Sequence, residues 1–139
     1  MRQITTHEVG GLNEKIQLYA IDERGSGNAN HEYHIDVFQL GSSAREGQNG
    51  DIETFRSAKH VGRWSIDFQK GPLKEAGANG ISNEVLLAIL IDRMQGFQSG
   101  PFASRENALA LTKLEEAMMW LQKRTRDRLA RGVEGTHQQ

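Results

Sequence analysis

The chain has 139 residues and a formal net charge of −1, and 37% of its residues are hydrophobic. This length accommodates one domain, or a small domain with a helical extension. The near-zero charge argues against general attraction to nucleic acid, and the lack of cysteine excludes disulfides and thiolate metal sites. No apolar run approaches the ~20 residues of a membrane span, and the N-terminus lacks a signal-peptide core, which together predict a soluble intracellular protein without a membrane partner.

The N-terminal half alternates apolar and polar side chains in several short runs, as strands do. Two runs cover Lys15–Ile21 and His31–Leu40, and one or two more are expected between Ile52 and Gln69. A glycine-rich connection, GSGNANH at 25–31, and a polar loop at 41–51 separate them. We therefore predict an N-terminal domain, residues 1–70, that is a small antiparallel β-sheet with one buried face.

The composition changes at Gly71, and residues 71–139 predict a helical hairpin domain with a short tail. Asn79-Gly80 indicates a turn, and Ser82 is placed to cap a helix that ends near Phe97. A second helix is expected to run from a cap at Ser104 to about Arg131. The fold class is thus α+β, with the sheet first and an antiparallel helical hairpin after it.

One side of the long helix carries a stripe of residues spaced by four and three positions. The stripe consists of Asn107, Leu111, Leu114, Met118, Leu121, Thr125 and Arg128. Its centre is apolar and its ends are polar, which suggests packing in the middle and recognition at the ends. The first helix is expected to have an apolar face made by Val85, Leu86, Ile89, Leu90 and Met94. It is apolar on two sides, which predicts contacts with a second subunit or with the sheet besides its partner helix.

Phe97 and Asn107 lie on either side of the turn between the helices and are candidate base contacts. An aromatic ring beside Gly96 and Gly100 could stack a nucleobase, or it could close the end of the hairpin. The Asn107 amide could pair with an adenine edge, or it could cap the helix or bond to the loop. The residues alone leave these alternatives open.

Arg124 and Arg128 lie one turn apart on the same side of the long helix. Two guanidiniums at this spacing could hold a phosphate or pyrophosphate. The alternative is a solvated helix end, because the macrodipole favours cations near a helix C-terminus by roughly 0.3–1 kcal/mol each.

The remaining patterns give no catalytic or metal site. The loop at 25–31 could bind an anion through its N–H groups, but it lacks a Walker sequence and is more simply a hairpin connection. His31 and His34 point to opposite faces of a strand, and Glu115 and Glu116 face apart on a helix. We therefore expect no metal, no cofactor and no catalytic residue.

The C-terminal half resembles a known family. Residues 71–137 include GFQSGPFASRENALALTKLEEA and RTRDRLARGVEGTH. These stretches are similar to the helical hairpin domain of the type 1 phage Thoeris anti-defence family, a domain shared with phage anti-CBASS proteins. The GSGNANHEY stretch resembles the β domain of the Thoeris members and differs from the hairpin-only anti-CBASS type.

The resemblance implies a phage protein that sequesters a cyclic nucleotide signal, without cleaving it, in the cytoplasm of the infected bacterium. The implied ligand is a glycocyclic ADP-ribose, with the cyclic di- and trinucleotides of CBASS as further candidates. The family's stacking Phe falls on Phe97, its base-contacting Asn on Asn107, and its phosphate-facing arginines on Arg124 and Arg128. Its pocket is shared by two protomers, which implies a homodimer or a hexamer built as a trimer of dimers.

Two other classes of function compete with this one. A nucleic-acid-binding phage accessory protein could use the basic end of the long helix, although the neutral overall charge and the lack of interleaved aromatic residues argue against it. An enzyme that degrades the nucleotide would need a metal constellation or a nucleophile–base pair, and the sequence presents neither.

Overall fold

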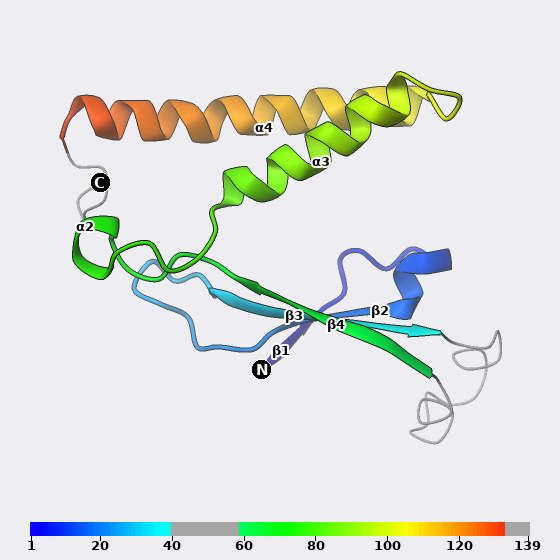
Figure 1. Ribbon diagram of the computed structural model, residues 1–139, viewed down its shortest axis with the longest axis horizontal. Helices are drawn as coiled ribbons and strands as arrows, with labels where there is room; N and C mark the ends of the chain where they lie inside the picture. Colours follow the sequence, from blue (N-terminus) through cyan, green and yellow to red (C-terminus); the bar gives the residue numbers. More distant parts are fainter. Residues whose placement is uncertain (40–58, 133–139) are drawn as a thin grey trace. The chain divides into compact units, whose positions relative to one another are not determined.

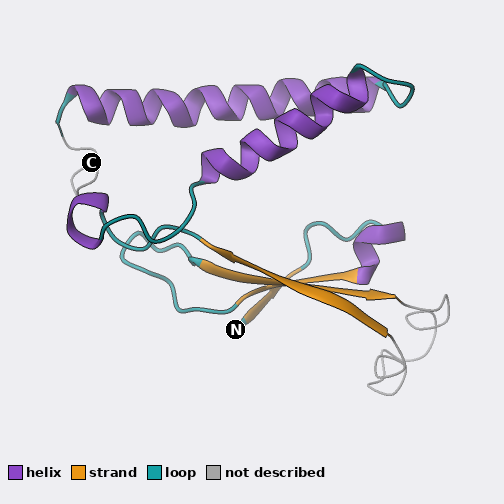
Figure 2. Cartoon of the chain, viewed as in Figure 1, coloured by secondary structure: helices purple, strands orange, loops and turns teal. Residues whose placement is uncertain are grey.

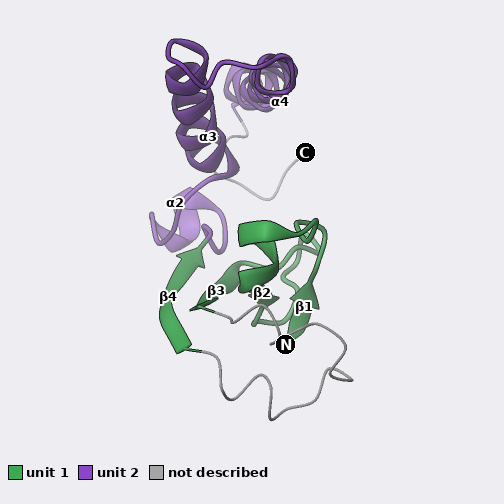
Figure 3. Ribbon diagram, turned by 90° about the vertical axis from the view of Figure 1, so that its right-hand side faces the viewer, with its two compact units in different colours: residues 1–67 green, residues 68–139 purple. Residues whose placement is uncertain are grey.

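The computed structural model describes residues 1–39 and 59–132, which belong to two compact units, Met1–Asp67 and Phe68–Gln139. Figure 1 follows the chain along its sequence, and Figure 3 colours the two units separately. Strands make up the first unit and helices the second, which confirms the α+β fold with the sheet before the helical hairpin.

Some expectations fall on other parts of the chain. The polar loop at 41–51, the strand start near Ile52 and the tail after Gly132 lie outside the described residues. The independence of the domains 1–70 and 71–139 as folding units stays a prediction.

The first unit is a four-stranded antiparallel sheet with strand order β1-β2-β3-β4. The strands are β1 (Arg2–Ile4), β2 (Ile16–Ala20), β3 (Glu32–Gln39) and β4 (Lys59–Asp67). Figure 2 shows them as one twisted sheet. Because each strand pairs with the next along the chain, the sheet forms from local connections.

The start of the sheet was not predicted. Residues 1–11 show no clear period in the sequence, but the chain forms β1 there and then a 3-10 helix, η1 (Gly11–Lys15), which precedes β2. A three-residue strand is too short to show an alternating pattern, so its pairing with β2 decides its structure.

The register of the strands gives the sheet one apolar face and one polar face. Leu18 and Trp64 both pair with Ile35, so their side chains share the apolar face. On the other face, Gln17 and Arg63 both pair with Asp36. The predicted alternation of β3 is confirmed, and it places a carboxylate in the middle of the polar face.

The second unit contains a short helix, α2 (Leu73–Ala76), and two long helices, α3 (Asn83–Gln98) and α4 (Arg105–Ala130). Both predicted caps are confirmed. The Ser82 hydroxyl accepts a hydrogen bond from the Val85 N–H at 3.2 Å, and Ser104 accepts one from the Asn107 N–H at 3.1 Å. The turn from Gly71 to Asn79 was predicted without a helix, and α2 is an addition to it.

The stripe predicted on the long helix is also confirmed. All seven of its positions are partly or fully buried, whereas most other positions of α4 are exposed. The recurring spacing places these residues along one side of α4, which packs against α3. Arg128, at the end of the stripe, is only 7% exposed.

The apolar face predicted for the first helix needs a correction. Val85, Ile89 and Leu90 are 47%, 53% and 43% exposed, so they do not form the buried face of α3. The less exposed apolar side chains of α3 are Leu86, Leu87, Ile91 and Met94. A helix that is apolar on two sides does not reveal which side faces its partner, so the sequence could not decide this.

The chain between β4 and α3 is held in a closed loop, residues 69–82, which we call the clip. Asn79 accepts a hydrogen bond from the Lys70 N–H and donates one to the Lys70 carbonyl, each at 2.8 Å. The Gln69 side chain accepts from the Asn79 N–H at 2.9 Å and donates to the Gly77 carbonyl at 2.6 Å. These bonds fix the two sides of the clip to each other.

Candidate functional site

Phe97 lies at the C-terminal end of α3 and is 37% exposed. The guanidinium carbon of Arg93, one turn earlier, lies 5.5 Å from the centre of its ring. This distance suits a cation–π contact, which covers part of one ring face and holds the ring in place. Arg93 was not predicted as part of the site, although its position four residues before Phe97 on a helix could have suggested the contact.

The turn after α3 brings the start of α4 close to Phe97. The Gln98 side chain accepts a hydrogen bond from the Ser104 N–H at 2.9 Å, which ties the end of α3 to the cap of α4. Asn107 lies in the first turn of α4, and its amide donates to the Phe102 carbonyl at 3.4 Å. A bond of that length is weak, so a better acceptor could take its place.

Asn107 is therefore not the cap of the long helix, because Ser104 fills that role. Its side chain makes only the long contact with the loop in the part of the chain that the structure describes. This leaves most of the bonding capacity of the amide for another partner.

Arg124 and Arg128 lie in the last two turns of α4. Asp127 is near them, but its carboxylate already accepts from Lys123 at 2.6 Å. Arg124 is exposed and makes no ion pair within the residues that the structure describes. Arg124 therefore places a positive charge at this end of α4 that the neighbouring carboxylate does not neutralise.

The structure places Phe97 and Asn107 on either side of one connecting turn and Arg124 one helical turn from Arg128, but it does not bring the two pairs together. Asn107 and Arg124 are seventeen positions apart on one helix, or about 25 Å at ~1.5 Å per residue. The pairs thus lie toward opposite ends of the hairpin, which Figure 1 shows along α4.

A cavity of about 690 Å³ lies beside the arginine pair, which is within the usual size range of small-molecule sites. It is lined by Gln69, Gly71, Pro72, Leu73, Ala78, Gly80, Ile81, Ser82, Val85, Arg124 and Arg128. Figure 1 shows that α3 and α4 lie close together at their connecting turn and farther apart at the other end, where the clip leads into α3. The clip was predicted only as a turn, and its place beside the arginines was not predicted.

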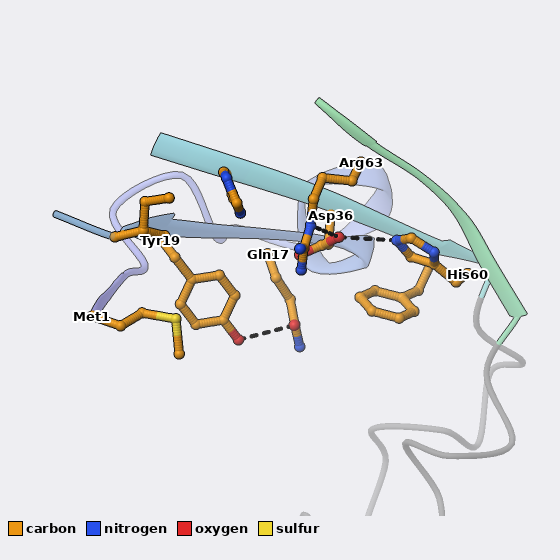
Figure 4. Close-up of a pocket in the computed structure, with 9 residues that line it drawn as sticks. Met1, Gln17, Tyr19, Asp36, His60 and Arg63 are labelled. Carbon is orange, nitrogen blue, oxygen red and sulfur yellow. Dashed lines mark hydrogen bonds and ion pairs between the residues drawn. The ribbon is translucent and has the colours of Figure 1, made fainter. Parts of the chain in front are cut away.

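The polar face of the sheet holds a second hollow, of about 410 Å³, which Figure 4 shows. Asp36, only 4% exposed, lies in it and accepts two hydrogen bonds from Arg63 at 2.9 Å. His60 Nε2 also lies 2.9 Å from the same carboxylate. The bonds from Arg63 lower the pKa of Asp36, with a further contribution from His60 and against the effect of burial.

This second hollow has its charged groups paired with one another. Asp36 is saturated by Arg63 and His60, and the rings of Tyr19 and Phe38 line the space beside them. The group was not predicted, because its members come from β3 and β4 and a sequence does not give the register between strands. Its arrangement explains how a carboxylate is kept ionised within the sheet.

Asp22 ties the start of the glycine-rich connection between β2 and β3 to its end, because its carboxylate accepts hydrogen bonds from Asn30, His31 and Glu32. Desolvation alone would raise the pKa of Asp22, but hydrogen bonds from the Glu32 and His31 N–H groups and the Asn30 amide outweigh it and lower the pKa to about 2. A carboxylate at this position repels anions. The geometry therefore favours a hairpin connection over the anion cradle that the glycines could have formed.

Among the described residues, no helix combines the length and the apolar character that crossing a membrane requires. The candidate ligand residues all lie on the hairpin. Phe97 and Asn107 lie at one end of it, and Arg124 and Arg128 lie at the other.

Comparison with known proteins identifies the class of this hairpin. Residues 65–126, which run from the end of β4 into α4, match the family model described as "Acb2/Tad1, hairpin domain". The class is therefore that of the Acb2/Tad1 hairpin proteins. The chain is also 45% identical over 115 residues to "Thoeris anti-defense 1" of Bacillus phage SBSphiJ7, covering 78% of this chain and 81% of the relative. This chain belongs to the Thoeris anti-defense 1 family.

Proposed function

We propose that this protein captures a cyclic nucleotide signal of bacterial immunity and sequesters it without cleavage. The observation that carries the proposal is the placement of Phe97 and Asn107 at one end of the hairpin and of Arg124 and Arg128 at the other. The proposed ligand is a glycocyclic ADP-ribose, and cyclic di- and trinucleotides are further candidates. Capture would take place in the cytoplasm of the infected host cell, where such a signal acts.

Phe97 and Asn107 suit the base of such a ligand. An exposed ring can stack on any base, and the Arg93 guanidinium holds the ring from its own helix. The Asn107 amide can give one hydrogen bond to an adenine edge and accept another. Exchange of its long contact with the Phe102 carbonyl for a shorter bond to the base would favour binding.

Arg124 and Arg128 suit the pyrophosphate. Guanidiniums form paired hydrogen bonds with phosphate oxygens, and these charge-assisted bonds are stronger than neutral ones. The Lys123–Asp127 ion pair leaves Arg124 available for such an anion. The position of the pair near a helix C-terminus favours its positive charge before any ligand binds.

The distance between the two pairs supports a site made by two copies of the chain. A cyclic molecule with one base and one pyrophosphate is too short to span about 25 Å along α4. If two hairpins pack antiparallel, Phe97 and Asn107 of one copy lie beside Arg124 and Arg128 of the other. The exposed side chains of Val85, Ile89 and Leu90 supply an apolar surface for this contact.

The test is to mix the protein with glycocyclic ADP-ribose, measure the free signal, remove the protein by heat and measure the signal again. A fall in free signal that heating restores unchanged supports sequestration. A chemically altered product would mean an enzyme, and no uptake would contradict the proposal. Binding of nucleic acid in place of the signal would favour the accessory-protein alternative.

Light scattering of the same sample measures the assembly. We expect a dimer or a hexamer, because both provide the two-copy site. A monomer that still binds the signal would contradict the shared site but not sequestration itself.

A further inference from the structure

Arg124 and Arg128 border two hollows, and an anion could approach them from either. One is the cavity of about 690 Å³ beside the clip. The other, of about 450 Å³, is lined only by residues of α4: Trp120, Lys123, Arg124, Asp127, Arg128 and Arg131. The side on which the ligand binds decides which other residues determine specificity.

The clip is built more firmly than a connection between a strand and a helix requires. Its hydrogen bonds between Asn79, Gln69 and Lys70 are joined by a bridge between Phe68 and Ile81, in which the Gln69 N–H donates to the Ile81 carbonyl at 3.0 Å. A rigid wall of this kind keeps a cavity open and limits what fits into it.

Gly80 is necessary for this closure. A Cβ atom at this position would lie 2.4 Å from the carbonyl carbon of Phe68 and 2.6 Å from the Gln69 nitrogen. These are backbone atoms, so a side chain would have to push the two sides of the clip apart. The Asn79-Gly80 turn thus allows the close approach of the two sides of the clip at the bridge between Phe68 and Ile81.

The two hollows differ in chemistry. The clip side offers apolar groups from Pro72, Leu73 and Val85 across from the guanidiniums, a combination that suits a sugar or base carrying a phosphate. The α4 side is lined by charged side chains and Trp120, and its carboxylate, Asp127, is paired with Lys123, so it offers positive charge to an anion but no apolar wall opposite the guanidiniums. It also consists of one helix surface, so a ligand there would be less enclosed.

We propose that the clip is the inner wall of the anion site, and that the phosphate and adjoining sugar of the ligand bind between the clip and α4. Leu73 contacts the sugar, and Asn79 is a positioning residue that holds the wall without touching the ligand. The proposal rests on the function proposed above and adds the residues that determine which nucleotides fit.

The deciding experiment compares Leu73→Ala with Trp120→Ala in binding glycocyclic ADP-ribose. The two residues are matched, because Leu73 is 54% and Trp120 64% exposed, and each lines a different hollow. Neither change adds a charge beside the arginines. Truncation on the ligand's side removes a contact with the sugar, so Leu73→Ala should raise Kd by about fivefold or more, whereas Trp120→Ala should change Kd by less than about threefold. The reverse order would overturn the proposal.

Light scattering and melting curves of both variants show whether either one fails to assemble or fold. If one does, hydrogen exchange of the wild-type chain decides. Ligand should slow exchange of the Lys70 and Asn79 N–H groups, which belong to the clip. If bound ligand leaves the hydrogen exchange of residues 69–82 unchanged, the clip is not a wall of the site. A wild-type chain that binds no ligand would instead overturn the proposed function on which the wall rests.

Asn79→Ala tests the positioning role. It removes two bonds to Lys70 at a site that does not line the cavity, so Kd should rise severalfold although Leu73 and the arginines are intact. The loosened wall should also accept bulkier cyclic nucleotides relatively better than the wild type does. An unchanged preference among ligands would contradict positioning and leave Asn79 with a role in stability alone.

Discussion

The sheet and the hairpin treat their charged groups in opposite ways. In the sheet, Asp36 is enclosed and receives bonds from Arg63 and His60, so the charges neutralise one another. In the hairpin, the nearby carboxylate is already paired with Lys123, and Arg124 remains exposed. The charges of Asp36, Arg63 and His60 are thus explained by folding, whereas Arg124 is left accessible to water or to a ligand.

The two units also differ in their apolar side chains. The sheet has its apolar residues on one face, set by the strand register. The hairpin uses one side of α3 and the stripe of α4 for its internal contact and leaves Val85, Ile89 and Leu90 exposed. Both units nevertheless leave large apolar side chains uncovered in a single chain, since Val61 and Trp64 of the sheet are 57% and 53% exposed. The hairpin is distinguished by carrying such side chains on the same unit as the candidate ligand residues.

The arginines give the strongest test of this contrast. Arg124→Ala should weaken signal binding by about 1.5–3 kcal/mol, because a charge-assisted bond to phosphate is lost, and this is roughly tenfold to over a hundredfold in Kd. Its melting temperature should hardly change, since the side chain is exposed. Calorimetry and thermal melting measure both quantities.

Arg128→Ala is the informative companion, because this residue is only 7% exposed. We expect a similar loss of affinity together with a measurable loss of stability, because a buried side chain contributes to packing. A solvated arginine at the helix end would cause no such loss of stability. Wild-type affinity in both variants would show that the arginines serve the helix and not a ligand.

Phe97 should give the next largest effect. Phe97→Ala removes a stacking partner worth roughly 1–3 kcal/mol, whereas Phe97→Trp retains a flat ring and most of the affinity. Arg93→Ala leaves the ring but removes its cation–π contact, so it should cost only about 0.5–1 kcal/mol. Titration of the signal against these three variants ranks them, and equal binding by Phe97→Ala and the wild type would remove the stacking role.

Asn107 and Ser104 separate recognition from capping at the start of α4. Ser104→Ala removes the cap and should cost ~1 kcal/mol of stability with little change in affinity. Asn107→Ala should do the opposite, because its own contact with the loop is long. Melting temperature and Kd are measured on both. A destabilised Asn107→Ala with wild-type affinity would assign the amide to the fold.

The smallest effect concerns the sheet alone. The pKa of Asp22 is about 2 in the folded chain and near ~4 when unfolded, so its contribution to stability is complete above about pH 4 and is lost as the pH falls toward 2. Asp22→Asn should therefore be less stable than the wild type at neutral pH and should lose less stability on acidification. Melting curves between pH 2 and pH 7 check this, and parallel curves would refute it.

The sequence predicted the parts of the fold that repeat. The stripe from Asn107 to Arg128 spans several turns, and the caps Ser82 and Ser104 precede apolar periodic segments, so local chemistry determined both helices. β1 and α2 are too short to carry a period, and their structure depends on neighbouring segments.

Residue type and spacing made Phe97, Asn107, Arg124 and Arg128 candidates but left other roles open for each of them. Their roles toward a ligand came from the resemblance and stay predictions. The wall made by the clip was not visible, because it depends on the path of the chain from β4 to α3. The Asp36–Arg63 pair was missed for a similar reason, since it joins residues from two strands.

The distance between the two ends of the hairpin has a consequence for mixtures of two defective variants. If each ligand site combines Phe97 of one chain with Arg124 of the other, Phe97→Ala damages the base half of a site and Arg124→Ala damages the phosphate half. A dimer that combines the two variants then keeps one site with both halves intact and has both defects in the other. Two proteins that are inactive when expressed singly would thus restore part of the signal capture when expressed together in one cell. A site contained within one chain would allow no such complementation.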